Sequence, residues 1–414
     1  MINDLLHQTS EIQGEFSNLQ ISLFNNLKKK FNETEKFGFV HATPFLVDQK
    51  DNERYKIFYE SLSAVIRRIV LAYSRDDELQ QIIPLKNRAR NLLDACSDEY
   101  RLGSLRPDFL LDREGNFKIN EINARFPTNG FFISYGINSA LNDVEELSKR
   151  GIIPLNDMNK VPSLFERLAG NITAIKESEP NWDISLYKEY LNSNGRKFSY
   201  VNPREIKLID NRLDLNGENL ESIVLELKQR EIIQNCTPEF ISVMQSHNHI
   251  NDLRTILLVH DKRLLAVLSD DKLLKKYSTE NEREVIKPGL IKTIAIQSYD
   301  DLKEEVSENK DEWVLKHALK GKGNQVYIGP ELSEEEWKIA CDTARKGSFV
   351  AQKYVNQKKF SIYLPHLGVY EMPFYGMLLG VDGRFASQGS YRGIAKDRTR
   401  LWDGLIFVPP AIQI

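Results

Sequence analysis

The hydrophobic positions of the first hundred residues recur mostly with helical spacing. Apolar side chains lie three or four residues apart over residues 5–31 and again over residues 51–73, which predicts two amphipathic helices. Residues 89–100 predict a third helix, and the short apolar run at residues 37–46 is typical of a strand. The N-terminal part is therefore expected to be mostly helical.

Two β-rich runs with a turn between them follow these helices. Residues 107–111 and 117–123 flank the sequence Asp-Arg-Glu-Gly-Asn, whose glycine suits a hairpin loop. Counting back from a loop at residues 113–116 places Asp108 opposite Glu121. Because side chains alternate along a strand, Glu121 and Asn123 share a face. The sequence thus predicts three converging oxygen-bearing side chains.

Two carboxylates in one small patch repel each other unless a cation lies between them. Hard oxygen ligands of this kind suit Mg²⁺, which takes one or two carboxylates together with nucleotide phosphates. The alternative is a solvated hairpin with a polar face. Phe117, Ile119 and Ile122 on the second strand favour an interior hairpin, and Arg125 adds a cation directly after it.

Helix and strand patterns alternate over residues 160–260, which predicts a small α/β lobe. Residues 261–269 then predict a helix that opens with an Asp cap. Residues 284–293 are interpreted as strand, turn and strand. They carry Lys287 and Lys292, each of which either reaches a phosphate or is simply solvated.

A second hairpin pattern spans residues 313–329. Its strands are joined by Lys320, Gly321, Lys322, Gly323 and Asn324. Glycine lets backbone N–H groups approach oxygen closely and lysine adds point charge, so this loop could form a mobile lid over polyphosphate. Many hairpins carry Lys and Gly, so an ordinary hairpin loop is the alternative to a phosphate-covering lid.

Two later strand patterns complete the chain. Residues 349–355 predict one strand, for which a plain aliphatic strand is the alternative to a binding role. Residues 377–395 predict a strand, an Asp-Gly turn, a second strand and a polar loop, with Arg384 and Arg392 as their cations.

Composition narrows the class of protein. The 414 residues are 41% hydrophobic and 28% charged with a net charge of −3, which is ordinary for a globular protein and predicts neither a nucleic-acid nor a membrane partner. Three widely spaced cysteines predict reduced thiols in the cytoplasm. The N-terminus has no secretory pattern, and no run approaches the ~18 apolar residues of a membrane span.

The hairpin of Asp108, Glu121 and Asn123 resembles the metal-binding hairpin of ATP-grasp enzymes, where an Asp and a Glu-x-Asn hold the Mg²⁺ of Mg-ATP. Here it precedes the lid, an order similar to the circularly permuted branch that includes eukaryotic glutathione synthetase and glutathionylspermidine-synthase-like proteins. The resemblance implies an α/β (α+β) ATP-grasp fold in permuted order. It implies a hairpin lobe at 1–160, a Rossmann-like substrate lobe at 161–260 and a nucleotide-binding lobe at 261–414.

The resemblance also implies ATP and one or two Mg²⁺ ions as cofactors. Asp108, Glu121 and Asn123 would be the metal ligands, and Lys316 matches the lysine that precedes the family's lid and contacts phosphates. Residues 349–355 resemble the hinge strand that reads adenine. The remaining nucleotide-binding candidates are Lys262, Lys287, Lys320, Gly321, Lys322, Gly323, Asn324, Gln352, Lys353, Tyr354 and Val355.

The match to glutathione synthetase itself is incomplete. Those enzymes have a metal-binding acid four positions after the lid lysine, followed by three glycines. Here Lys320 stands at the acidic position and Lys322 replaces the middle glycine. This departure leaves Asp108, Glu121 and Asn123 as the metal set.

The implied activity is an ATP-dependent carboxylate–amine ligase that works through an acyl phosphate and releases ADP and phosphate. Arg125 would clamp the carboxylate, or else be a structural ion-pair partner of Glu121 or Asp108, and Arg392 would stabilise the transferred phosphoryl group. The binding partners would be a small carboxylate and a small amine. The sequence leaves open whether the protein forms a homodimer. The alternatives are a kinase-like phosphotransferase on the same scaffold and a non-catalytic binding protein.

Overall fold

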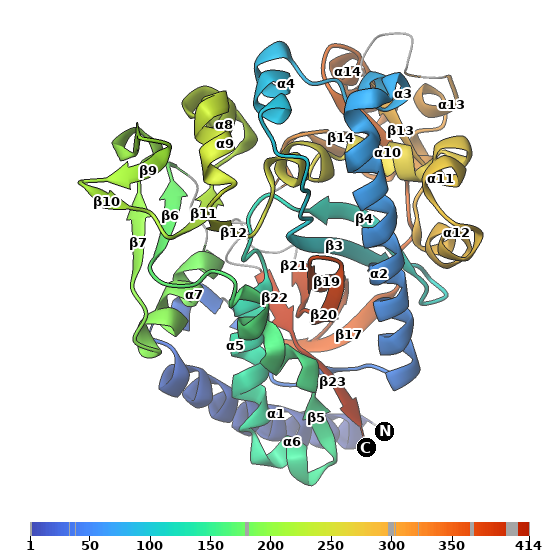
Figure 1. Ribbon diagram of the computed structural model, residues 1–414. Coiled ribbons are helices and arrows are strands. Elements are labelled where there is room, and N and C mark those ends of the chain that lie inside the picture. The colour runs from blue at the N-terminus through green and yellow to red at the C-terminus, as the bar shows by residue number, and fades with distance from the viewer. Residues whose placement is uncertain are drawn as a thin grey trace.

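The computed structural model describes residues 2–32, 34–37, 39–178, 182–296, 302, 304–321, 323–364, 368–394 and 405–413. The fold is mixed α/β, as the sequence predicts, and its strands form several separate sheets (Figure 1). Lys322 lies outside the described residues.

The largest sheet has seven strands and combines three distant parts of the chain. The hairpin strands pair with the C-terminal strands, because β3 lies antiparallel to β19. Residues after 374 therefore leave the lid region and join the hairpin. In order, the strands are β1 (Phe39–Val40), β22 (Leu405–Val408), β21 (Tyr391–Ile394), β19 (Tyr375–Val381), β3 (Ser104–Leu111) and β4 (Phe117–Asn123), with β20 (Arg384–Gln388) pairing to β19.

A helix covers each face of this sheet. Leu378 of β19 packs into a core with the apolar side of α2 (Gln49–Ala72), whereas its neighbours Met377 and Leu379 pack into a second core with α5 (Phe131–Asn142). This alternation is what a strand buried on both faces requires. The hairpin therefore lies in the middle of three layers.

The hairpin confirms the predicted pairing of Asp108 with Glu121, although the loop register is one residue off. Leu111, not Asp112, lies opposite Phe117. A bulge then interrupts the ladder, because Asp108 pairs with Glu121 and the next residue Phe109 pairs with Ile119. The extra residue on β4 restores the predicted opposition.

A four-stranded parallel sheet forms the predicted α/β lobe, drawn in green in Figure 1. Its strands are β12 (Asn248–His249), β11 (Ser222–Glu226), β6 (Ile172–Lys176) and β7 (Phe198–Val201), in that order. Its helices are α7 (Trp182–Ser193), α8 (Gln229–Asn235) and α9 (Pro238–Met244), and a small sheet of β8 (Lys207–Ile209), β9 (Arg212–Leu215) and β10 (Glu218–Asn219) is attached to it.

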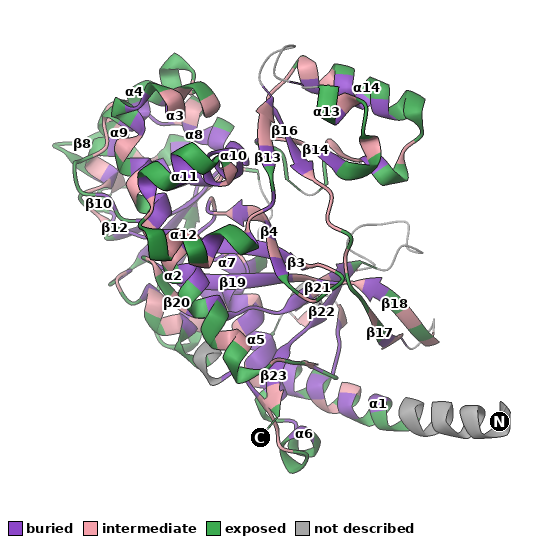
Figure 2. Ribbon diagram, turned by 90° about the vertical axis from the view of Figure 1, so that its right-hand side faces the viewer, coloured by how far each residue is buried: buried purple, intermediate pink, exposed green. Residues whose placement is uncertain are grey.

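The lid region forms its own antiparallel sheet with a separate core. Trp313 and Trp337 are fully buried in this core. In Figure 2 this sheet and α14 lie above β3 and β4. The strand order is β13 (Thr293–Ile296), β16 (Phe349–Lys353), β14 (Trp313–His317) and β15 (Val326–Ile328), covered by α13 (Glu304–Ser307) and α14 (Glu334–Arg345).

The remaining elements connect these sheets. α1 (Ile2–Lys30) packs against α5, and no helix in the described ranges is long and apolar enough to cross a membrane. The others are α3 (Asp77–Ile82), α4 (Asn87–Asp94), α6 (Glu145–Lys149), α10 (Arg263–Ser269), α11 (Asp271–Tyr277), α12 (Glu280–Ile286), the sheet of β2 (Phe45–Leu46), β23 (Pro410–Gln413) and β5 (Ile152–Pro154), and the hairpin of β17 (Lys359–Leu364) and β18 (Gly368–Pro373).

Some predicted features are wrong. The polar loop expected before residue 395 contains the strand β21. The helix α10 has Lys262, not Asp261, at its N-cap position.

Residues 284–286 end the helix α12 and are not a strand. A capping box fixes the start of this helix, because Thr279 accepts from the backbone N–H of Glu282 and the Glu282 carboxylate accepts from that of Thr279. Lys287 therefore follows directly after the helix α12, in a short 3-10 turn that includes Pro288.

Candidate functional site

The site forms where the hairpin strand β4 meets the start of α10 and the lid sheet. Glu121 of β4 forms an ion pair with Lys262, whose Nζ lies 3.1 Å from Oε1. The same Nζ donates to the carbonyl oxygen of Lys320 at 2.7 Å. Lys262 is buried, and a π-helical turn at Thr255–Val259 leads the chain toward it. One ammonium thus joins the hairpin to the lid.

The carboxylate of Glu121 is held in its ionised form. Burial acts to raise its pKa, but the charges of Lys262, His260 and Lys316 outweigh burial and lower the pKa to about 2. Glu121 is therefore an anion throughout the neutral range. A cation that enters the site would meet a full negative charge.

Lys316 brings a second ammonium to this place from β14. Its Nζ donates to Oε1 of Gln352 at 2.7 Å and, more weakly, to the carbonyl oxygen of Asn120 at 3.4 Å. Burial lowers the pKa of Lys316 to about 8, with Glu121 opposing this shift and Lys262 adding to it. Lys316 remains mostly protonated near neutral pH. The predicted lid lysine and the predicted hairpin acid are thus brought together.

Asp108 is engaged by two arginines. Arg106 donates from Nε to Oδ1 at 2.9 Å and from Nη2 to Oδ2 at 3.1 Å. Arg392 of β21 donates to the same Oδ2 at 2.5 Å, and Asn123 donates its Nδ2 there at 3.0 Å. Asp108 is only 5% exposed. It therefore acts as the shared counter-charge of the buried Arg106 and the half-buried Arg392.

These contacts bear on the predicted metal ligands. The Nδ2 of Asn123 faces Asp108, which turns its Oδ1 away, and Glu121 supplies an ionised carboxylate two residues earlier on β4. One carboxylate and one amide oxygen fit a single Mg²⁺ carried by a nucleotide. Asp108 already accepts four hydrogen bonds, so its role as a ligand stays a prediction. No group of three His, Cys, Asp or Glu able to hold a metal occurs in the described part of the chain.

Arg125 lies just beyond the end of β4. Its guanidinium is stacked 4.1 Å from the ring centroid of Phe126. It lies close enough to His260 to influence that ring, because burial, Arg125 and Lys262 together lower the pKa of His260 to about 3. The structure thus places Arg125 next to the group formed by Glu121 and Lys262. This position is compatible with both the clamp and the structural role.

The loop that joins β14 to β15 carries the predicted lid residues. Lys320 Nζ donates to Oε1 of Gln325 at 2.8 Å, so the side chain folds back over its own loop. Gly323 has a φ of +72°, and Asn324 donates its N–H to the carbonyl of Gly321 at 3.2 Å. A Cβ at Gly321 would meet nothing within 4 Å. The loop is open enough for its N–H groups to approach a ligand.

The predicted hinge residues differ in what they can offer. The N–H of Lys353 donates to Lys292 O at 2.9 Å and that of Tyr354 to Glu312 O at 2.7 Å, while the Lys353 ammonium pairs with Glu312. The N–H of Val355 donates to no group among the residues that the structure describes. Among the three hinge residues Lys353, Tyr354 and Val355, the backbone N–H of Val355 is therefore the one best able to donate a hydrogen bond to a nucleotide base.

Lys287 is not brought to this group. Its Nζ lies 2.6 Å from Asp271 Oδ1 in a pair whose two side chains are more than half exposed. Its expected contact with a phosphate gains no support from this position. The helix end described above carries it to the outer surface.

Arg106 and Asp183, like His260, escaped the sequence prediction. Arg106 lies two positions before Asp108 on the same strand, so the alternation that aligned Glu121 with Asn123 could have indicated it. Asp183 is a buried carboxylate that accepts from the N–H groups of Phe132 and Ile133 at the start of α5. Burial raises the pKa of Asp183 to about 7. No local signal separates Asp183 from an ordinary helix residue.

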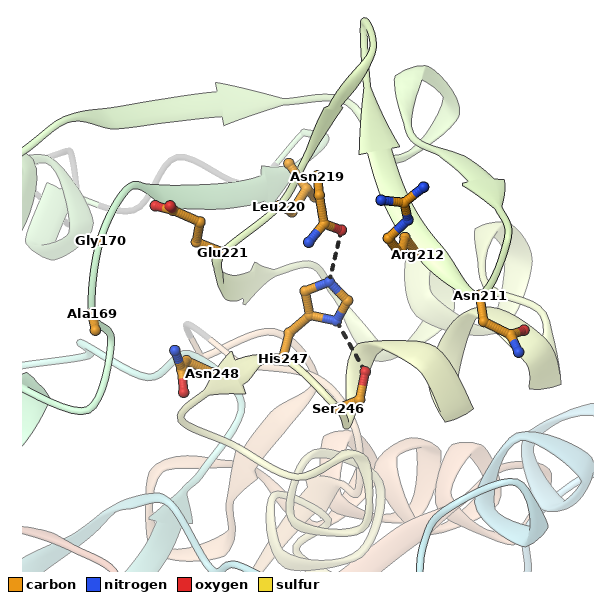
Figure 3. A pocket seen from close by; sticks show the side chains of 10 residues that line it. All are labelled: Ala169, Gly170, Asn211, Arg212, Asn219, Leu220, Glu221, Ser246, His247 and Asn248. Atoms are coloured by element: carbon orange, nitrogen blue, oxygen red, sulfur yellow. Dashed lines mark hydrogen bonds between the residues drawn. The ribbon is translucent and has the colours of Figure 1, made fainter.

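A separate surface pocket lies at the amino ends of the parallel strands. It encloses about 480 Å³, and Figure 3 shows His247 between Asn219 and Ser246 at its centre. Ligands of open parallel sheets bind at the carboxyl ends of the strands, which is the opposite edge. None of the predicted site residues lines this pocket.

Comparisons with known proteins bear on the class of the fold. Residues 58–258 match the family model described as the AnkG N-terminal domain. The ATP-grasp enzyme ankG of Aspergillus thermomutatus is 23% identical over 428 residues, which cover 89% of this chain and 88% of that protein. A solved structure of a glutathione synthetase-like effector from Globodera pallida, in its apo form, superposes with a TM-score of 0.58 at 12% identity over 95% of this chain and 96% of that one.

The fold is therefore that of the glutathione synthetase-like ATP-grasp class, as the resemblance of the hairpin indicated. Within this class, the chain is related to the ATP-grasp enzyme ankG along most of its length.

Proposed function

We propose that this protein is an ATP-dependent carboxylate–amine ligase. The observation that carries the proposal is the meeting of the ionised Glu121 with the ammonium groups of the buried Lys262 and the half-buried Lys316, between the hairpin and the lid. Two fixed cations beside one carboxylate suit a polyphosphate that arrives with a divalent metal. The relationship to an ATP-grasp enzyme supports the same class of chemistry.

Each residue would then have a defined task. Lys262 and Lys316 would neutralise the phosphates, and Val355 would receive the base through its backbone N–H. Glu121 and Asn123 would hold Mg²⁺, which supplies charge neutralisation at the phosphates when it is bound. The loop of residues 320–324 would cover the nucleotide and exclude water.

The reaction would proceed in two steps. A substrate carboxylate attacks the γ-phosphorus of ATP, which forms an acyl phosphate and breaks the bond to ADP. An amine then attacks the acyl carbon, loses a proton and expels phosphate to leave an amide. The protein needs alignment and charge stabilisation for this and no covalent step of its own. Arg392 lies beside Arg106 at the end of the site and would stabilise the anionic groups.

A screen for ADP release tests the proposal. Amino acids, polyamines and short peptides are offered in pairs with Mg-ATP, and the products are identified by mass spectrometry. ADP together with an amide supports the ligase, whereas ADP together with a phosphoester supports the phosphotransferase. A protein that binds no ATP in a direct titration would contradict both and support the non-catalytic alternative.

The change Arg125→Lys separates the two roles of Arg125. Lysine keeps the charge but loses the bidentate fork, so a substrate clamp should show a KM for the carboxylate raised by about tenfold with little change in the KM for ATP. A structural partner should instead lower the melting temperature and impair both substrates. Arg113→Lys, on the exposed turn of the same hairpin, is the matched control. An unchanged carboxylate KM would remove Arg125 from the active site.

A further inference from the structure

Three polar side chains from three strands line one face of the lid sheet. Gln352 of β16 lies directly opposite Thr293 of β13 and opposite Val314 of β14. Lys316 is two residues beyond Val314 on the same strand and therefore shares its face. Gln352 and Thr293 are 2% and 5% exposed, so these two polar side chains are buried in the sheet, whereas Lys316 is half-buried.

A chain of hydrogen bonds fixes the orientation of the Gln352 amide. The Thr293 hydroxyl donates to the carbonyl of Ile291 at 2.9 Å and has only one hydrogen to give. Its oxygen must therefore accept the bond from Gln352 Nε2, which is 3.2 Å away. The amide cannot turn over without losing this bond, so Oε1 is directed to the Lys316 ammonium at 2.7 Å.

The chemistry of the amide suits this place. A carboxylate here would form a buried ion pair with Lys316 and cancel the charge that a phosphate needs. An apolar side chain would leave a buried ammonium with one donor unsatisfied. A neutral acceptor holds the ammonium and leaves its charge available. The other charged groups that face Lys316 are Glu121 and Lys262.

We propose that Gln352 is a positioning residue that aims the Lys316 ammonium at the nucleotide phosphates without neutralising it, and that Thr293 fixes the Gln352 amide for this purpose. This inference rests on the proposed binding of ATP by Lys316. It assigns to the Gln352 side chain a task in phosphate binding, apart from any contact of the hinge backbone with the base.

A double-mutant cycle tests the inference by equilibrium titration of ATP and of adenosine. Gln352→Leu should weaken ATP binding by about tenfold, because it removes a hydrogen bond to a charged group. Adenosine has no phosphate, so its affinity should change by less than about twofold. In a Lys316→Met background, Gln352→Leu should have no further effect on ATP.

Thr293 supplies a second, milder pair of variants. Thr293→Val keeps the shape but removes the hydroxyl and should weaken ATP binding in the same direction, whereas Thr293→Ser keeps the hydroxyl and should retain it. Gln352→Glu should also weaken ATP binding, because it neutralises Lys316. Melting temperatures identify any variant that fails to fold, in which case the Thr293 pair decides.

The outcomes separate this inference from the proposed function. Equal losses for ATP and adenosine, or an undiminished effect of Gln352→Leu in the Lys316→Met background, would show that Gln352 only supports the sheet and would overturn the inference alone. Failure of the unmodified protein to bind ATP would overturn the inference and the proposed function together.

Discussion

Glu121→Gln is expected to abolish turnover while the protein remains folded. The substitution keeps the shape of the side chain but removes the carboxylate that pairs with Lys262 across the site. Loss of one anionic ligand from a Mg²⁺ site should cost several kcal/mol of transition-state stabilisation, which is a decrease in kcat of at least about a hundredfold. Steady-state ADP release at saturating Mg-ATP measures it.

The hairpin offers a matched control for this experiment. Glu114→Gln makes the same chemical change on the exposed turn and should leave turnover unchanged. Because the pKa of Glu121 is lowered to about 2, its titration should not appear in a pH–rate profile near neutrality. Near wild-type turnover in a folded Glu121→Gln protein would refute the assignment of Glu121 to the metal.

Asp108→Asn should reduce stability more than other single changes in the hairpin. Asp108 is the shared acceptor of Arg106 and Arg392, and its own side chain and that of Arg106 are almost wholly buried. Removing the charge leaves the buried guanidinium of Arg106 without its counter-charge, which typically costs about 3 kcal/mol or more. Urea unfolding without nucleotide should show this as a lower free energy of unfolding.

The same experiment distinguishes two roles of Asp108. A residue that mainly holds the arginine pair should destabilise the free protein when it is changed, whereas a residue that only binds metal should leave the free protein unaffected. The exposed Asp98, changed to Asn, is the control for loss of an acidic side chain. An unchanged unfolding midpoint in Asp108→Asn would contradict the structural role described here.

The sequence by itself determined the local elements that carry the site. Alternation along two short strands with a glycine turn, whose Gly115 has a φ of +86°, was enough to predict the hairpin and the opposition of Asp108 and Glu121. Period and turn chemistry act over a few residues, so they can be seen in one chain. The same reasoning failed at residues 284–286, which belong to a helix whose start is fixed by a capping box, although the chain does turn at Lys287–Gly289 as predicted.

Only the tertiary structure decided which charges meet. Arg392 reaches Asp108 across 284 positions of the chain, because β19 and β21 return to the sheet that contains the hairpin. Lys262 and Lys316 meet Glu121 because α10 and the lid sheet pack against β4, and the register of β16 with β13 and β14 decides that Gln352 holds Lys316. Such contacts depend on how separate sheets pack, and neither periodicity nor spacing encodes the distance between side chains on different elements.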